Sequence, residues 1–365
     1  MIDIDGALLE GGGQVVRISS SLSALTKTPI RIHSIRAGRP KPGLAAQHLA
    51  GIQLVAALCS GSLTGDSIGS VEVSLSPGAG LLQQKEYLSD AKTAGATSLL
   101  FQSSLPVCAF PSSLPSPSKS PPRTKLTLKG GTNVPFAPQF EYLQHILLPN
   151  LRRLVGLEAD AKLLRRGVFP KGGGIVEALV TASESVKGFT VMERGKVTAL
   201  SGYAWACGNS AEAQVEGMSQ GVRETLAEAG GDLAGLEVAL EGSVEGKAAG
   251  NCYGTVLWAA TESGMVIGAS SLAGKGTDPL SCGSLAAREL MREVTHGGCV
   301  DCYMQDQIIV FMSLSPAPSQ ISCGPVTQHT RTAIHFAELL TGATFTLTEG
   351  ASGAALHCTG RPGRA

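Results

Sequence analysis

The chain has no excess of charge of either sign. Its 365 residues contain 29 Lys and Arg against 29 Asp and Glu, which gives a formal net charge of zero at pH 7. A protein that coats nucleic acid without regard to sequence needs a strongly positive surface, so the composition argues against that class. It leaves room for an enzyme that grips only a strand end, because a few local cations are sufficient for such a contact.

Two kinds of apolar segment are also missing. No long uncharged apolar run could span a bilayer, and no charged stretch followed by an apolar one opens the chain. We therefore expect no membrane span and no secretory leader. Hydrophobic residues still make up 43% of the sequence, which indicates a globular chain with a sizeable core.

The nine cysteines are odd in number and irregularly spaced. This usage predicts free thiols in a reducing compartment rather than a disulfide framework. His296, Cys299 and Cys302 form an H-x-x-C-x-x-C string. Zinc usually takes four ligands, and no second C-x-x-C pair is present to complete a site. Whether this string binds a metal stays open from the sequence alone.

Glycine, in contrast, is abundant. The 46 glycines include the clusters 11–13, 130–131 and 172–174. Such clusters predict tight turns whose backbone amides approach a ligand, often a phosphate, although a turn-rich fold alone would also use them.

Hydrophobic patterning predicts an α/β layered fold in which a strand–helix order recurs in three similar units. Pro149 is expected to kink the helix of the second unit. The expected elements are strands at 2–5, 30–36, 71–75, 125–129, 308–314 and 344–347, and helices at 14–25, 45–59, 139–155 and 330–340.

A segment of different character interrupts these units. We expect a large domain formed by 1–182 and 278–365, and a small inserted α/β domain at 183–277. The inserted domain is expected to contain a helix at 211–229 and strands at 236–240, 256–260 and 265–270. The Pro/Ser tract at 111–123 cannot supply a core and is expected to loop out.

Two motifs near the start predict phosphate binding. The first, E-G-G-G-Q-V-V-R at 10–17, places glycine amides at a strand-to-helix turn with a carboxylate beside them, which suits a phosphate and a divalent metal. It is not a P-loop, because no Gly-Lys-Ser/Thr follows. The second, R-A-G-R-P-K-P-G-L at 36–44, holds three cations on a segment stiffened by two prolines and leads into His48, for which a structural role is favoured.

Three further strings lie in the second half of the chain. They are R-G-V-F-P-K-G-G-G at 166–174, Y-M-Q-D-Q at 303–307, and G-P-V-T-Q-H-T-R-T at 324–332. An Asp before an apolar strand and a His at the start of a helix could serve as a metal ligand and a nucleophile. A lone His in that position would more often be structural.

Together these strings resemble the RNA 3'-terminal phosphate cyclase family. E-G-G-G-Q, R-A-G-R-P-K-P-G-L-x-x-Q-H-L, G-G-T-N-x-P-x-A-P, R-G-x-x-P-x-G-G-G and H-T-x-T-A-I-H-F-A-E occur here in that family's order and cover nearly the whole chain. The resemblance implies a large domain of three repeated α/β units, like the C-terminal domain of a translation initiation factor, with a small inserted domain.

The resemblance also implies residue roles. His329 corresponds to the nucleophile that attacks the α-phosphorus of ATP, and Glu10 to the acidic residue that holds Mg²⁺ or Mn²⁺. Tyr303 and Pro138 correspond to the pair that sandwiches adenine. The other positions implied to bind ATP or its phosphates are Gln14, Arg17, Arg36, Arg39, Gln47, Asp306 and Gln307.

The implied reaction closes an RNA 3'-phosphate into a 2',3'-cyclic phosphate through histidine-bound AMP and an RNA adenylate. The implied partners are ATP and RNA 3'-phosphate ends, without a membrane. A homodimer is compatible with this function. We expect the protein to be located in the nucleus or otherwise in the cytoplasm.

Two other functions compete with this one. A branch of the same superfamily acts in ribosomal RNA processing without catalysis and lacks the nucleophilic His, whereas His329 is present here. An enolpyruvyl transferase would also be built from repeated α/β units with basic clamps. It would not need the segment around His329.

Overall fold

The first α/β unit holds the two phosphate-binding motifs. The computed structural model describes residues 1–365 apart from 79–84, 112–120, 249 and 363–365, and the central part of the predicted Pro/Ser loop falls outside the described residues. The unit consists of β1 (Ile2–Asp5), α1 (Gly13–Thr26), β2 (Ile30–His33), α2 (Ala46–Leu58), β3 (Ser62–Thr64) and β4 (Val73–Ser76).

The second unit has the same order of elements. It consists of β5 (Glu86–Asp90), α3 (Thr97–Ala109), β6 (Arg123–Gly130), α4 (Phe140–Tyr142), the π-helix η1 (Leu143–Leu147), α5 (Leu148–Val155), β7 (Glu158–Arg165) and β8 (Gly174–Thr181). The segment from α4 to α5 confirms the helix expected at 139–155. Pro149 lies just after the π-helical turn, which interrupts the regular α-helical hydrogen bonds where the proline lacks an N–H.

The third unit is interrupted after its first strand. It consists of β9 (Thr190–Val191), α8 (Cys302–Leu314), β14 (Ser319–Cys323), α9 (Gln328–Thr341), β15 (Phe345–Glu349) and β16 (Ala354–Cys358). In all three units the first strand is parallel to the second, and the fourth lies antiparallel between the second and the third. The prediction of three repeated α/β units is therefore confirmed.

One element of the third unit was predicted wrongly. The apolar run 308–314 was expected as a strand, but it is the second half of helix α8. Asp301 starts this helix, because its carboxylate accepts hydrogen bonds from the backbone N–H groups of Tyr303 and Met304. The helix is buried on nearly all sides, so its sequence lacks the polar stripe that would reveal a helical period.

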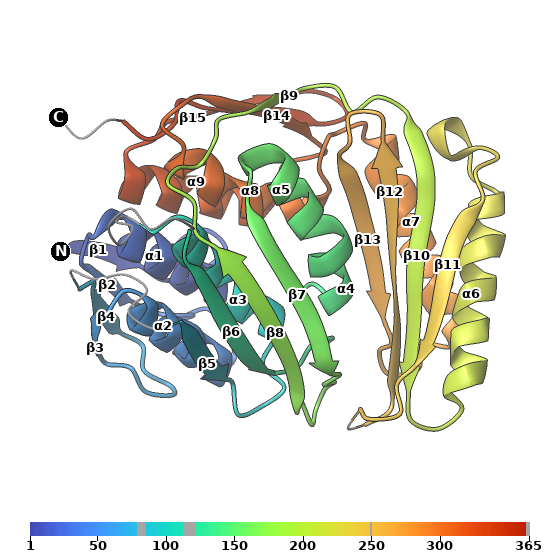
Figure 1. The fold of residues 1–365 in the computed structure, drawn as a ribbon, viewed down its shortest axis with the longest axis horizontal. Helices are drawn as coiled ribbons and strands as arrows, with labels where there is room; N and C mark the ends of the chain where they lie inside the picture. Colours follow the sequence, from blue (N-terminus) through green and yellow to red (C-terminus); the bar gives the residue numbers. More distant parts are fainter. Residues whose placement is uncertain (79–84, 112–120, 249, 363–365) are drawn as a thin grey trace.

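The inserted unit has its own sheet and its own core. It contains β10 (Val197–Cys207), α6 (Ala211–Ala227), the short 3-10 turn η2 (Gly231–Leu233), β11 (Val238–Val244), β12 (Cys252–Thr261), β13 (Val266–Leu272) and α7 (Pro279–Thr295). Leu290 and Val294 of α7 are buried with Leu257 and Ile267 of this sheet. We therefore propose that the insertion runs from the end of β9 to α7, beyond the boundary expected at 277. Figure 1 shows this unit beside the second one.

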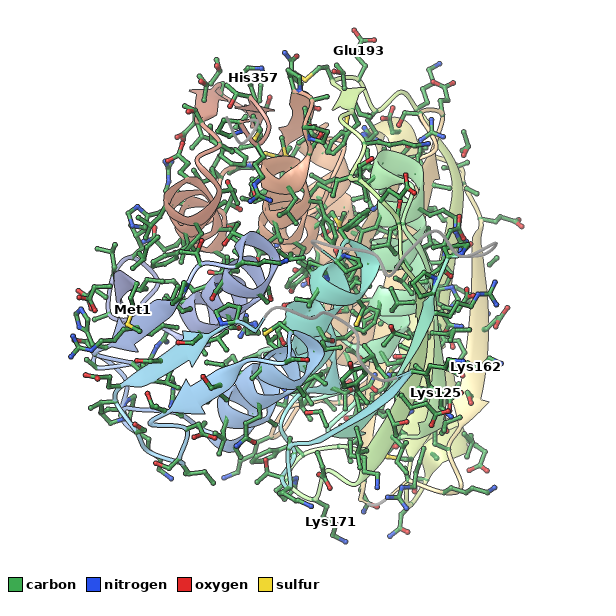
Figure 2. The ribbon with its side chains drawn as sticks, turned by 60° about the vertical axis from the view of Figure 1, so that its left-hand side comes forward. Met1, Lys125, Lys162, Lys171, Glu193 and His357 are labelled. Carbon is green, nitrogen blue, oxygen red and sulfur yellow. The ribbon has the colours of Figure 1, made fainter. Side chains whose placement is uncertain are left out.

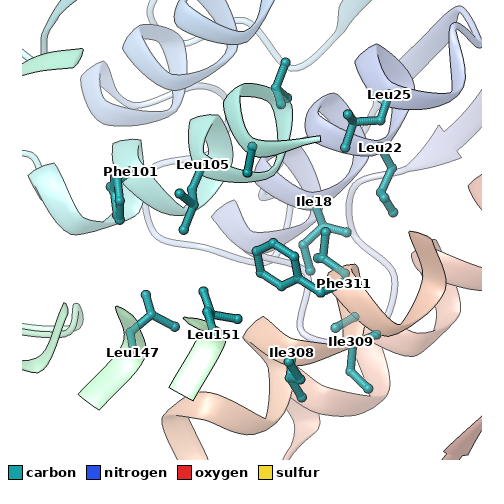
Figure 3. Packing of buried hydrophobic residues seen from close by; sticks show 14 of the residues in the cluster. Ile18, Leu22, Leu25, Phe101, Leu105, Leu147, Leu151, Ile308, Ile309 and Phe311 are labelled. Carbon is teal, nitrogen blue, oxygen red and sulfur yellow. The ribbon is translucent and has the colours of Figure 1, made fainter. Parts of the chain in front are cut away.

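Helices from the three repeated units share one large core. Ile18 of α1, Phe101 of α3, Leu151 of α5 and Phe311 of α8 meet there (Figure 3). This packing brings the beginnings of α1, α8 and α9 close together and thereby positions the site. In the described part of the chain, every helix is too short or too polar to cross a membrane.

Candidate active site

The centre of the site is the side-chain amide of Gln14 in the first turn of α1. Its Nε2 donates to Asp306 Oδ2 at 2.7 Å and to the backbone oxygen of His329 at 3.1 Å. Both partners are acceptors, so this atom must be the amide nitrogen. Oε1 of Gln14 therefore faces His329 Nδ1, 3.0 Å away, and accepts a hydrogen bond from it. In the neutral imidazole this contact selects the tautomer with the proton on Nδ1, in which Nε2 of His329 carries the lone pair.

The helix that carries His329 begins at a well-defined cap. The side chain of Thr327 accepts from the backbone N–H of Thr330 at 3.1 Å, which places His329 in the exposed first turn of α9. The buried side chain of Gln305 fastens the loop before this cap. Its Oε1 accepts from Thr330 Oγ1 at 3.0 Å, and its Nε2 donates to the backbone oxygen of Pro325 at 3.2 Å.

Sequence reasoning missed Gln305 and chose its neighbour Gln307. Both residues are polar neighbours of Asp306 on the largely apolar helix α8, which was the available signal. The structure distinguishes them by their partners. Gln305 holds the His329 loop, whereas Nε2 of Gln307 donates to the backbone oxygen of Tyr303 at 2.6 Å and its Oε1 has no partner among the described residues.

Asp306 shares the side-chain amide of Gln14 with His329. Burial raises the pKa of Asp306 from 3.8 to about 6, while His329 and Arg17 oppose the rise. Burial likewise lowers the pKa of Arg17, against the attraction of Asp306 and Glu10. The guanidinium of Arg17 is therefore a poorly hydrated cation, which favours contact with an anionic ligand at this position.

Glu10 is placed beside the glycine turn as the sequence predicted. Its backbone N–H donates to Thr332 Oγ1 at 3.2 Å, and its Oε1 is ion-paired with Arg39. Its Oε2 is buried without a hydrogen-bond partner among the described residues. A Cβ on Gly12 would come within 2.3 Å of this carboxylate, so a larger residue there would require the Glu10 side chain to move.

A divalent metal fits this arrangement. Mg²⁺ typically binds one or two carboxylates together with phosphate oxygens and water, and the orphaned Oε2 of Glu10 could supply such a ligand. The H-x-x-C-x-x-C string is different. In the described part of the chain, no group of three or more His, Cys, Asp or Glu side chains is arranged to hold a metal ion, so His296, Cys299 and Cys302 form no such site.

The basic segment at 36–44 is anchored by its own contacts. Arg36 Nη1 donates to the backbone oxygen of Gly43 at 2.8 Å, and Arg39 reaches the backbone oxygen of Glu10 at 3.1 Å. Gln47 Oε1 accepts from the backbone N–H of Ala96 at 3.0 Å and so ties α2 to the start of α3. This segment reaches the glycine turn through the contacts of Arg39 with Glu10.

His48 connects the two phosphate-binding motifs. Its Nδ1 accepts from the backbone N–H of Ala45 at 3.2 Å, and its ring lies where a Cβ on Gly13 would be. Burial, together with the charges of Arg17 and Arg36, lowers the pKa of His48 from 6.5 to about 3. The ring is therefore neutral, in line with the structural role favoured from the sequence.

A pocket of about 450 Å³ opens next to His329. Such a volume is within the range of small-ligand sites. The ring of Tyr303 lies 5.7 Å from that of Tyr142, in an edge contact, and its hydroxyl donates to Glu289 at 3.2 Å. Expected site residues that line the pocket are Arg17, Pro138, Tyr303, Asp306, Gln307 and His329, whereas Glu10, Gln14, Arg36, Arg39 and Gln47 do not.

Comparison with known proteins identifies the class. Residues 8–347 match the family model described as RNA 3'-terminal phosphate cyclase, and the chain belongs to this family. It is similar to an RNA 3'-terminal phosphate cyclase of Drosophila melanogaster, with 35% identity over 94% of this chain and 92% of that protein.

Two further relatives agree. A probable RNA 3'-terminal phosphate cyclase of Dictyostelium discoideum is 34% identical over 94% of this chain and 78% of that protein. An RNA 3'-terminal phosphate cyclase of Pyrococcus abyssi is 34% identical over 95% of each chain.

Proposed function

We propose that this protein uses ATP to convert an RNA 3'-phosphate into a 2',3'-cyclic phosphate, with His329 as the nucleophile. The observation that carries the proposal is the hydrogen bond between Gln14 Oε1 and His329 Nδ1, which leaves the lone pair of Nε2 available beside the pocket. Pro138 and Tyr303 line the same pocket and would hold the adenine ring.

In the first step, Nε2 of His329 forms a bond to the α-phosphorus of ATP. The bond from that phosphorus to the bridging oxygen breaks, and pyrophosphate leaves with the electron pair. Negative charge develops on the phosphates, where Arg17 and the segment of Arg36 and Arg39 would stabilise it. Gln14 keeps the Nδ1 proton in place and so aims Nε2 at the phosphorus.

In the second step, an oxygen of the RNA 3'-phosphate attacks the phosphorus of the bound AMP, and the bond to Nε2 breaks. The vicinal 2'-hydroxyl then attacks the RNA phosphorus. That attack closes the ring, gives up the hydroxyl proton and expels AMP. Because the ring needs a 2'-hydroxyl, the product is specific to RNA ends.

Mg²⁺ or Mn²⁺ would neutralise phosphate charge when bound, with Glu10 as its protein ligand. The carboxylate of Glu10 also orients Arg39, so loss of Glu10 should disturb both functions. We further propose that the protein is located in the nucleus, or otherwise in the cytoplasm. A homodimer is compatible with the proposed function. The alternative is a non-catalytic factor in ribosomal RNA processing, which would not require the lone pair on His329.

The test is labelling of the protein by ATP. Purified protein is incubated with Mg²⁺ and ATP labelled at the α-phosphate, without RNA, and acid-labile label on the protein is measured. Wild type should be labelled, His329→Ala should not, and Glu10→Ala should be labelled weakly. His335→Ala is the matched control, because His335 is an exposed histidine on the same helix α9. A 3'-phosphorylated RNA should discharge the label. A folded wild type that takes no label with Mg²⁺ or Mn²⁺ would refute the proposal.

A further inference from the structure

Phe136 is an exposed aromatic residue at the rim of the pocket. Its side chain is fully exposed, and its backbone has a φ of 64°, a left-handed conformation that is rare for a bulky residue. Both exposure of the ring and backbone strain disfavour Phe at this position. A residue kept at the cost of strain points to a function in binding.

The loop that carries Phe136 is firmly held. Asn133 Nδ2 donates to Gln139 Oε1 at 3.1 Å and to Glu141 Oε2 at 2.8 Å, and all three residues are buried. Val134 packs in a small apolar cluster with Ala96. The ring is therefore presented to solvent by an ordered loop, which reduces the entropy lost when a ligand stacks on it.

Two further loops lie against this one. The backbone of Val168 forms a bridge with Asn133, and a Cβ on Gly172 would touch Ala94. The three segments 92–96, 130–139 and 165–173 therefore meet at one edge of the sheet of the second unit. We refer to them together as the rim loops.

The rim loops combine exposed aromatic and basic side chains. They contain no Asp or Glu, although the whole chain has equal numbers of acidic and basic residues. Phe169 is 64% exposed, and Lys92, Arg165 and Lys171 are exposed, Lys92 in an ion pair with Asp90. The side chain of Lys171 projects outward from the lower end of the molecule in Figure 2.

We propose that the rim loops bind the single-stranded RNA just upstream of its 3'-phosphate, with Phe136 stacking on a base. Proteins that bind single strands without sequence preference combine aromatic side chains, which stack on the bases, with basic side chains near the phosphates. Stacking tolerates any sequence because every base has a π-face. The proposed function supplies the identity of the ligand, and this inference rests on it. Binding by the rim loops explains how a chain without net charge can hold an RNA end.

The test is equilibrium binding of a 5'-fluorescent RNA oligonucleotide with a 3'-phosphate, followed by anisotropy. Phe136→Ala should raise Kd by about 5- to 150-fold, the range for loss of one stacked aromatic. Phe136→Trp should restore binding, and Phe136→Leu should not. Leu88→Ala is the matched control, since Leu88 is 62% exposed on β5 of the same unit. Lys171→Ala should reduce the slope of log K against log salt concentration by about one, as expected for the loss of one phosphate contact.

Two further comparisons separate stacking from a structural role. An oligonucleotide that lacks the stacked base should bind wild type as weakly as Phe136→Ala, and the variant should not distinguish it from intact RNA. Phe136→Gly should also weaken binding while it keeps or raises the melting temperature, because glycine adopts positive φ freely. Equal Kd values for wild type and Phe136→Ala would overturn the inference. Absence of label from ATP in wild type would instead refute the proposed function.

Discussion

Gln14 Oε1 and His329 Nδ1 are 3.0 Å apart, although 315 positions separate these residues in the chain. Gln14 belongs to the first unit and His329 to the third. The tautomer of the histidine therefore depends on how these two units dock, and helix α1 is as necessary to the site as helix α9.

Gln14→Ala should slow labelling by ATP roughly 10- to 100-fold, because loss of a group that aims the nucleophile has costs of this order. Gln14→Glu should be slower still, since it places a second carboxylate where the amide now donates to Asp306 at 2.7 Å. Single-turnover labelling rates measure both effects. A rate for Gln14→Ala equal to that of wild type would show that His329 does not need this contact.

Gln305→Leu should destabilise the fold by about 1–3 kcal/mol, because it leaves buried groups of the 324–330 segment without their partner. It should also slow labelling, since the cap of α9 loses its anchor. Urea unfolding and labelling rates test this together. Gln320→Leu on β14 is exposed and serves as the control. If the two variants behave alike, Gln305 does not fix the loop.

His48 should make stability depend on pH. Its pKa is 6.5 when unfolded and about 3 when folded, so its contribution is complete above pH 6.5 and is lost as the pH falls toward 3. At about pH 5 the loss should amount to about 2 kcal/mol. His48→Gln, which keeps an acceptor for the N–H of Ala45, should remove this part of the pH dependence. Urea unfolding of wild type and His48→Gln at about pH 7.5 and about pH 5 measures this loss of unfolding free energy. An equal loss in both proteins would contradict the prediction.

Arg166 joins the second unit to the insertion. It is 2% exposed, pairs with Glu141 at 2.7 Å and Glu245 at 2.9 Å, and lies 4.2 Å from the ring of Trp205. Arg166→Met should cost about 3–5 kcal/mol, because it leaves the buried carboxylate of Glu141 without its ion-pair partner.

Arg152→Met is the control for this prediction. Its ion pairs with Glu158 and Asp160 are exposed, and their loss should cost less than about 1 kcal/mol. Urea unfolding of both variants gives the comparison. A small effect at Arg166 would mean that its ion pairs contribute little to holding the insertion against the second unit.

The α/β order could be predicted because alternating strands, glycine turns and one-sided helices such as α9 follow one another along the chain, although helices α3 and α7 were not expected. The helix expected at 330–340 is α9, and the strand at 344–347 is β15. Helix α8 escaped prediction because burial on nearly all sides removes the periodic signal on which such reasoning depends.

The contacts among the expected site residues could not be predicted from the sequence. Motifs pointed to Gln14, Asp306 and His329, yet nothing in their spacing shows that one amide joins all three. Gln305 was missed for the same reason. Its role depends on partners some twenty positions away that only the fold brings close.

Because the three units share one strand–helix order, the segment between the second strand and the second helix is the same structural position in each. In the first unit it is 34–45, with the basic residues Arg36 and Arg39. In the second it is 131–139, with Phe136 and Pro138, and in the third it is 324–327, directly before the helix of His329. Under the proposed function, these three equivalent connectors would supply cations for the phosphates, an aromatic and a proline ring for stacking, and the support of the nucleophile. The site would then need one connector from each of the three units, because each connector supplies only one of these groups.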